Sequence, residues 1–517
     1  MSMKNILELT ASEARKYMLK GNQYCTFRLP EYFVFDKALA FAEKNIGARE
    51  DIECYALERK EGKEKRIKPS NFDGVNYLLF SNKDGKLDYR PLSLINPFYY
   101  YLLVRLITTP EAWKEIVDRL NTLKDPHISV ESIPIVDEDN RDKKTIIGWW
   151  SHVEQRSIEL SFNYKYMFVT DITNCYGSIY THSIAWAMMG IDKAKKQREN
   201  KTLLGNKLDI AFRGMQYGQT NGIPQGNIVS DLIAEIVLAY TDSLIAEKAK
   251  EEKIENYHII RYRDDYRVFC KDKNNLEKLV FVMQKVLAIF NFKINSSKTS
   301  IEEDLVLGAL KKDKVAMFNF FLHRNGLDVE GLKTDKSLLQ KELLAIYSFS
   351  KQYPNSGSVE RLLGDFYDSF KSADIKNSNW TVLAAILVSI ARDNPRTYGI
   401  VAALISLFAE RMNKNERENL ILEMYSKVTQ WPNSSLLMVW LQRITLKIDK
   451  ELKYDDPICR AVEEENFNLW NHNWLDESLK TGFCNELFIS KNIIDSMTST
   501  IEKKNVSPFY RYEKDGE

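Results

Sequence analysis

The chain has 517 residues, of which 44% are hydrophobic and 28% charged, with a net charge of +1 at pH 7. This length allows two or three domains, and the hydrophobic content excludes a largely disordered protein. The charge excludes a strongly basic binder, but residues 1–325 carry 49 Lys and Arg against 44 Asp and Glu, while residues 326–517 carry 24 against 28. If nucleic acid binds, we expect it on the first part.

The six cysteines lie far apart and form no Cys-x-x-Cys pair, which argues against a disulfide framework or zinc site and fits a reducing compartment. Residues 1–21 contain no long apolar core, so we expect no signal peptide. The longest apolar runs are too short to span a bilayer. We therefore predict a cytoplasmic protein with no membrane partner.

In chain order, the first polar candidates follow extended segments. Arg90 precedes a helix that we expect to begin near Pro97, because proline favours the first helical turn. Arg90 could face an anion, although a surface arginine is the simpler interpretation. Residues 166–170 read as a β-strand that ends in Asp171. That carboxylate could lie in a site, and its alternative role is a helix N-cap.

A basic helical stretch over residues 192–213 is either a solvated face or a surface that tracks phosphates. Residues 222–226, Gly-Ile-Pro-Gln-Gly, then form a turn before a long helix, predicted as amphipathic over residues 230–248. The glycines on either side of Pro-Gln let the backbone approach a flat ligand and present the amide of Gln225. An ordinary loop before a helix is the alternative.

Residues 257–270 predict a β-hairpin with Asp264 and Asp265 at or beside its turn. On a straight strand two adjacent side chains would point to opposite faces, whereas at a turn both can reach the same side. Paired carboxylates suit a hard cation such as Mg²⁺. A solvated acidic turn is the alternative, since Asp is common in turns.

After the hairpin, the pattern predicts a helix over residues 275–290, a strand and turn over residues 292–300, and a short apolar strand over residues 317–322. From about residue 335 the strand signals fade. Amphipathic helices are then predicted over residues 335–352, 358–372, 380–392, 397–413, 415–429, 434–450 and 484–504. Their succession indicates an irregular helical solenoid.

The order of these segments resembles the palm of reverse transcriptases. A strand ending in Asp is followed five residues later by an aromatic residue, then by Gly-Ile-Pro-Gln-Gly before a helix, a Tyr-x-Asp-Asp hairpin, and an Asn-x-x-Lys-Thr turn. The resemblance covers roughly residues 90–322. It implies an α+β polymerase fingers and palm over residues 1–325, and the helices add an all-α domain of irregular helical repeats over residues 326–517.

Residues 170–184 further resemble the bacterial abortive-infection (Abi) reverse transcriptases, the AbiK-like antiphage group often carried on prophages or plasmids. That family joins a polymerase domain to a helical C-terminal domain, makes DNA without a template, primes from a protein hydroxyl and forms homo-oligomers. The resemblance therefore implies a prophage-encoded, metal-dependent DNA polymerase. Its expected partners are dNTPs, single-stranded DNA attached to the protein, and further copies in a trimer or hexamer.

Within this resemblance, Asp171, Asp264 and Asp265 are the expected catalytic residues. In phosphoryl transfer, two metal ions clamp the attacking and leaving oxygens, and three carboxylates from adjacent strands can hold both ions. We therefore expect two Mg²⁺ or Mn²⁺ ions as cofactors. Clustered carboxylates repel one another without a cation, which favours a functional role.

The resemblance also assigns four nucleotide-binding residues. Tyr176 matches the aromatic gate that stacks under the sugar and excludes a 2′-hydroxyl, which favours deoxynucleotides. Gln225 would lie beside the incoming base and sugar. Lys298 would approach the triphosphate, and Arg90 would belong to the phosphate contacts of the fingers.

Two features depart from ordinary reverse transcriptases. Arg263 stands before the acid pair, where a small or aliphatic residue is common, and no template-binding thumb is recognisable after Leu322. Both put templated copying in doubt. Tyr17, Tyr24 and Tyr32 are candidate priming residues only because they are N-terminal hydroxyls, and packing in the core is the alternative for each.

Two other functions remain open from the sequence. The first is a conventional RNA-templated reverse transcriptase of the retron or intron type, which needs a template and a primer. The second is a catalytically silent palm that serves as an oligomeric scaffold. The presence of all three acids disfavours the scaffold.

Overall fold

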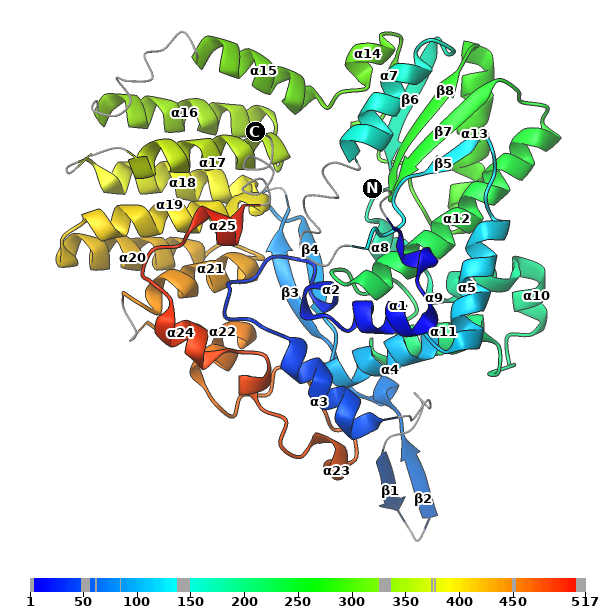
Figure 1. Cartoon of the computed structure of the whole chain (residues 1–517), viewed down its shortest axis with the longest axis horizontal. Helices are drawn as coiled ribbons and strands as arrows, with labels where there is room; N and C mark the ends of the chain where they lie inside the picture. The colour runs from blue at the N-terminus through cyan, green and yellow to red at the C-terminus, as the bar shows by residue number, and fades with distance from the viewer. Residues whose placement is uncertain are drawn as a thin grey trace.

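The computed structural model describes residues 4–47, 56–60, 63–83, 85–136, 149–324, 336–372, 375, 378–448 and 452–507. A sheet with its covering helices lies on one side of the molecule and a stack of helices on the other (Figure 1). The N-terminal helices and a long hairpin lie below and between them. This arrangement agrees with an α+β part followed by a helical part. Strict repeats within the helical part remain a prediction.

The first side is built on a five-stranded sheet with the strand order β5-β7-β8-β6-β9. The strands are β5 (Ile128–Val130), β6 (Tyr166–Asp171), β7 (Tyr257–Tyr262), β8 (Asp265–Cys270) and β9 (Ser300–Glu302). β5 runs parallel to β7, and the other pairs are antiparallel. The hairpin predicted over residues 257–270 is confirmed as β7 and β8, joined by Arg263 and Asp264.

Alternate residues of the sheet enter two different cores, as the period of two in a β-strand requires. Phe168, Ile259 and Val268 join the large core that also contains α12 (Ile228–Glu251) and α13 (Lys273–Ile289). The opposite face of the sheet has a smaller core made of Val153, Leu160, Met167, Ile260, Phe269 and Leu305. The sheet is therefore covered on both faces, which fixes its register.

The helix expected over residues 230–248 is present as α12, but its predicted amphipathic character is wrong. Almost every residue from Ile228 to Asp242 is buried, including polar ones. α12 runs through the interior, with α13, α5 and α9 packed around it. A helix enclosed on all sides shows no polar stripe, and its buried acids must find partners within the protein.

Two hairpins and a further group of helices complete this part of the molecule. β1 (Ala56–Lys60) pairs with β2 (Lys63–Ile67), and β3 (Tyr77–Asn82) pairs with β4 (Tyr89–Leu94), both antiparallel. The helices of this part are α1 (Ala11–Met18), α2 (Gly21–Tyr24), α3 (Asp36–Ile46), α4 (Pro97–Ile107), α5 (Pro110–Thr122), α8 (Cys175–Ser178), α9 (Thr181–Met189), α10 (Ile191–Lys196) and α11 (Leu204–Gly214). α4 begins at Pro97 as predicted and is almost wholly buried.

The helical stack matches six of the predicted helices closely. These are α16 (Lys336–Gln352), α17 (Gly357–Ser372), α18 (Trp380–Asp393), α19 (Tyr398–Arg411), α20 (Lys414–Val428) and α21 (Ser435–Thr445). In the part of the chain that the structure describes, every helix is too short or too polar to cross a bilayer.

Two further predictions of local structure are wrong. Residues 317–322 lie within a helix, α15 (Lys312–Arg324), instead of a strand. A run of six mainly apolar residues fits either structure, so its length and composition could not decide. Instead of one long helix, residues 484–504 contain the short helices η7 (Asn485–Leu487) and α24 (Lys491–Ser496) and the start of α25 (Lys503–Val506), with turns between them.

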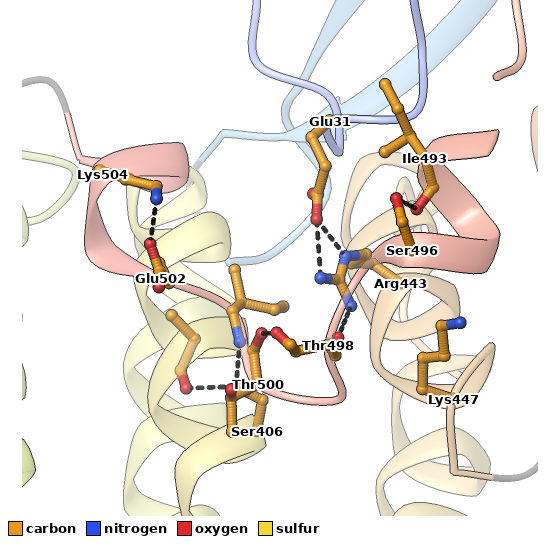
Figure 2. Close-up of polar contacts among 12 residues, drawn as sticks. Glu31, Ser406, Arg443, Lys447, Ile493, Ser496, Thr498, Thr500, Glu502 and Lys504 are labelled. Atoms are coloured by element: carbon orange, nitrogen blue, oxygen red, sulfur yellow. Dashed lines mark hydrogen bonds and ion pairs between the residues drawn. The ribbon is translucent and has the colours of Figure 1, made fainter.

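This C-terminal segment is held by contacts with distant parts of the chain. The buried Arg443 donates from Nε and Nη2 to Oε1 of Glu31, at 2.9 and 2.7 Å, and from Nη1 to the carbonyl of Thr498 at 3.2 Å (Figure 2). The amide of Ile501 donates to Oγ of Ser406 at 2.9 Å. Arg443 on α21 therefore joins the helical stack both to the N-terminal part of the chain and to this C-terminal segment.

Candidate active site

The three predicted catalytic carboxylates meet at one edge of the five-stranded sheet. Asp171 is the last residue of β6 and lies directly opposite Asp265, the first residue of β8. Asp264 belongs to the adjacent turn, and its carbonyl accepts a hydrogen bond from the amide of Ile172 at 3.0 Å. The pairing of β6 with β8 thus brings Asp171 to two acids that follow it by 93 and 94 positions in the sequence.

The turn that carries Asp264 is strained and firmly anchored. Arg263 has a φ of +55°, a left-handed conformation that non-glycine residues seldom adopt. Its carbonyl accepts a hydrogen bond at 3.1 Å from Arg261, whose side chain is completely buried. Arg261 pairs with Glu235 at 3.0 Å and Asp242 at 2.6 Å, both on α12. Strain of this kind persists where the surroundings fix the backbone, often at functional sites.

The surroundings of Asp264 and Asp265 favour the neutral, protonated form of their carboxyl groups. Burial, with the neighbouring Asp264 second, raises the pKa of Asp265 to about 6. Burial also raises the pKa of Asp264, and the charge of Asp171 adds to this effect. Removal from water and repulsion between like charges both favour the protonated acids. A bound cation would reverse this preference.

The donor chemistry at this edge suits divalent cations. Oδ1 of Asp171 is buried, and no described residue donates a hydrogen bond to it. Oδ2 of the same carboxylate lies 2.5 Å from Nζ of Lys298, so an ammonium group occupies a position where a metal ion could bind. Among the described residues, no three His, Cys, Asp or Glu side chains form a ready-made cation cage. Hard carboxylate oxygens are nevertheless the ligands that Mg²⁺ prefers.

Tyr176 lies in α8, five residues after Asp171, and is half-buried. Its hydroxyl donates to Oδ1 of Asp231 at 2.7 Å, and its carbonyl accepts from the amide of Ile223 at 2.9 Å. The loop that contains Gln225 therefore lies against the segment that contains Tyr176. Burial, with the charge of Asp231 second, raises the pKa of Tyr176, so its hydroxyl stays protonated at neutral pH.

The loop of Gln225 is fixed by its backbone. The backbone carbonyl of Gln225 accepts a hydrogen bond from the amide of Ser93 on β4 at 2.8 Å. The carbonyl of Gly226 accepts one from the amide of Thr26 at 2.9 Å. Gly226 has a φ of +113°, and a Cβ there would lie 2.7 Å from Cδ1 of Phe27. Glycine is thus required at this position by both conformation and space, and the backbone at Gln225 is held at a defined place.

Arg90 lies on β4 and is half-buried. Burial lowers the pKa of its guanidinium, the charge of Arg396 lowers it further, and the charge of Asp264 opposes this effect. Arg396 belongs to η6 (Pro395–Thr397) in the helical stack. At the neighbouring Asp393, the stack meets the turn of the β3–β4 hairpin, where a Cβ on Gly85 would lie 1.9 Å from the carboxylate. The helical stack therefore contributes positive charge near the carboxylates.

Three further residues lie near the carboxylates but were not predicted from the sequence as members of the site. Asp231 contacts Tyr176 and Arg263. Burial lowers the pKa of the Lys311 ammonium, and the charge of Asp265 opposes that effect. Arg396 comes from beyond the predicted domain boundary. An acid in the first turn after Gly-Ile-Pro-Gln-Gly was a usable signal for Asp231, whereas only the fold reveals Arg396 and Lys311.

The three tyrosines considered for priming are packed in the core. Tyr17, Tyr24 and Tyr32 are all buried, and the hydroxyls of Tyr17 and Tyr24 donate to the carbonyls of Ile135 and Ile95. Burial raises the pKa of Tyr24 and of Tyr32. The structure therefore supports the packing alternative for each.

Comparison with known proteins agrees with this geometry. A family model described as reverse transcriptase (RNA-dependent DNA polymerase) matches residues 82–328, which include the sheet edge, the glycine-rich loop and Arg90. No curated protein matches.

Several solved telomerase structures are distantly similar. A Candida tropicalis telomerase truncated from the C-terminal domain is 15% identical with a TM-score of 0.26, and the match covers 52% of this chain and 54% of that one. The Candida albicans telomerase in complex with a TWJ fragment of telomeric RNA is 14% identical with a TM-score of 0.30, covering 79% and 68%. The chain thus spans about half of the first structure. Likeness at this level carries no argument about function.

The family match and the sheet edge concern the same residues. Residues 82–328 match the reverse transcriptase family model, and such domains generally use two divalent metal ions. The position of the three carboxylates within that domain fits this chemistry. The match indicates that residues 82–328 belong to a nucleotidyltransferase domain of the reverse-transcriptase family.

Proposed function

We propose that the protein is a metal-dependent DNA polymerase of the abortive-infection type, which joins dNTPs without a template and acts in antiphage defence. The observation that carries the proposal is the meeting of Asp171, Asp264 and Asp265 at one sheet edge, next to positive charge from the helical stack. The resemblance of residues 170–184 to Abi reverse transcriptases supports the antiphage role.

The three carboxylates would hold two divalent ions, which supply charge neutralisation at the attacking and leaving oxygens. In the reaction, a hydroxyl oxygen at the growing end attacks the α-phosphorus of a dNTP. The bond from this phosphorus to the bridging oxygen breaks, pyrophosphate leaves, and the hydroxyl proton passes to water. Asp171 and Asp265 are held by paired strands, so they would orient the reacting groups with little reorganisation.

The nucleotide would be positioned by side chains around this edge. Tyr176 would pack beneath the sugar, and Gln225 would lie beside the base. Arg90 and Lys298 would bind phosphate oxygens, because both are cations near the carboxylates. Nζ of Lys298 lies 2.5 Å from Oδ2 of Asp171, so binding a triphosphate oxygen would require Lys298 to give up this contact.

The proposal extends to features that follow from the resemblance alone. We propose that a protein hydroxyl primes synthesis, leaving single-stranded DNA covalently attached. We also propose a prophage-encoded, cytoplasmic protein that forms a trimer or hexamer. The division between the polymerase and helical domains at residues 325 and 326 falls outside the described residues, and it remains part of the proposal.

The test is synthesis without nucleic acid. Purified protein is incubated with single dNTPs and Mg²⁺ or Mn²⁺, and the products are separated on a denaturing gel before and after protease treatment. The proposal predicts DNA that migrates with the protein until the protease releases it. Growth only on an added primer with an RNA template would contradict template independence and priming from the protein.

A conventional RNA-templated reverse transcriptase is the second candidate. The family model that matches residues 82–328 is itself described as an RNA-dependent DNA polymerase. This candidate predicts a strict need for both template and primer, with a product complementary to the template. Sequencing of the product from the same incubation, with and without RNA, distinguishes the two.

A further inference from the structure

Asp231 contacts two parts of the candidate site that lie far apart in the sequence, namely Tyr176 and the turn that contains Arg263. It lies in the first turn of α12 and is 8% exposed. Oδ1 accepts the hydrogen bond from the Tyr176 hydroxyl at 2.7 Å. Oδ2 lies 3.6 Å from Nη2 of Arg263, which directly precedes Asp264. A single carboxylate therefore joins the aromatic ring to the strained turn.

Three acids of α12 pair with two of the three arginines of the β7–β8 hairpin. Glu235 and Asp242 pair with Arg261, which is completely buried. Asp231 lies four residues before Glu235, on the same helical face, and pairs with Arg263. The charge of Asp231 is the largest influence on the pKa of Arg263 and raises it. The anchoring of the turn thus extends along α12 to the Tyr176 hydroxyl.

We propose that Asp231 is a specificity-determining positioning residue, which holds the ring of Tyr176 in the place where it excludes a 2′-hydroxyl. This inference rests on the proposed role of Tyr176. The hydroxyl proton of Tyr176 is donated to Asp231. A 2′-hydroxyl next to the ring therefore cannot accept a hydrogen bond from Tyr176. A ring released from Asp231 regains freedom of rotation, and small displacements of positioning groups change discrimination strongly.

Aspartate is well suited to this position. An ionised carboxylate is an acceptor at both oxygens, so it can accept from the tyrosine hydroxyl and the guanidinium together. An amide would present its NH₂ to one of these two donors. Asp231→Asn should therefore weaken the connection, and Asp231→Ala should remove it.

The test is a double-mutant cycle of Asp231→Ala and Tyr176→Phe, which removes only the hydroxyl. Discrimination is measured as the ratio of kcat/KM for dATP and ATP with Mn²⁺. It is measured again as the ratio of their affinities in Ca²⁺, from thermal shifts. We expect each single variant to lower discrimination roughly tenfold, and the double variant to lower it no further. Asp231→Asn gives a milder second variant if Asp231→Ala folds poorly.

The matched control is Asp192→Ala, which removes an exposed aspartate from the first turn of α10. It should leave both ratios unchanged. The inference is overturned if Asp231→Ala changes the use of dATP and ATP equally, if the two substitutions add, or if the wild type does not discriminate in either assay. A wild type that prefers dATP in binding but makes no DNA would contradict the proposed function, and the binding cycle would still decide the role of Asp231.

Discussion

Lys298 lies where it can compete with a cation for Asp171. Its Nζ is 2.5 Å from Oδ2, although the side chain is 67% exposed. We predict that Lys298→Met has two opposite effects. The apparent affinity for Mn²⁺ should rise a few-fold because a competing charge is removed, while the KM for dNTPs should rise roughly tenfold because a phosphate ligand is lost. Titrations of Mn²⁺ and dNTP on one incorporation assay measure both.

The second effect is what distinguishes a phosphate ligand from a surface ion pair. Exposed ion pairs contribute little to stability, about 0–1 kcal/mol, so Lys298→Met should leave the folded state almost unchanged. If both the Mn²⁺ dependence and the KM stay at wild-type values, Lys298 has no part in the site.

At the scale of elements, the contact between α4 and the C-terminal part depends on a neutral histidine. Nδ1 of His472 lies 3.1 Å from Nδ2 of Asn96, the N-cap of α4, and the ring packs edge-on against Phe98 and Phe483. Burial lowers the pKa of His472 to about 4. The Asn96 amide can donate only to an unprotonated Nδ1, so protonation would break this contact.

This depressed pKa predicts how stability depends on pH. The folded state binds fewer protons at His472 than the unfolded state, so its contribution is complete above about pH 6.5 and is lost as the pH falls towards 4. The loss amounts to up to about 3 kcal/mol. Urea denaturation between pH 7 and 4 should show a shallower decline for His472→Gln than for the wild type. Parallel curves for the two proteins would contradict the prediction.

Local sequence patterns predicted most of the helices and strands, and contacts between distant residues determined the others. Six helices of the stack and the β7–β8 hairpin followed from apolar periodicity and from breaks at proline and asparagine. Residues 484–504 did not form the predicted helix, because contacts with distant residues such as Ser406 hold them in turns. The carboxylates could be named in advance through the resemblance. Arg396 could not, since only the fold brings it near Arg90, and the one sequence signal for Asp231 was an acid in the first turn of the helix after Gly-Ile-Pro-Gln-Gly.

At the scale of the whole molecule, Arg443 joins the ends of the chain. Glu31→Ala would leave the Arg443 guanidinium buried without its carboxylate (Figure 2). We predict a loss of about 3–5 kcal/mol in the free energy of unfolding. Glu464→Ala, which breaks the exposed pair with Arg460, serves as the control and should cost under about 1 kcal/mol. Equal losses in chemical denaturation would show that burial does not strengthen the Arg443 contact.

The helical stack should also influence substrate binding through Arg396. We predict that Arg396→Ala raises the KM for dNTPs roughly three- to tenfold with little change in kcat, because its charge lies near Arg90 and acts on the triphosphate. Added salt should reduce the difference from the wild type. Lys414→Ala, at an exposed position on α20, is the control and should have no effect. An unchanged KM for dNTPs in Arg396→Ala would show that the helical stack does not influence substrate binding.

In the proposed function, the three carboxylates hold the metal ions of a polymerase that needs no template. The most direct measurement is incorporation of labelled dNTP without nucleic acid by the wild type, Asp264→Ala and the exposed control Glu277→Ala, with Mn²⁺ and with EDTA. We predict product from the wild type and the control with Mn²⁺, none with EDTA, and at least about a 100-fold loss in Asp264→Ala. Equal incorporation by Asp264→Ala and the wild type would contradict the account.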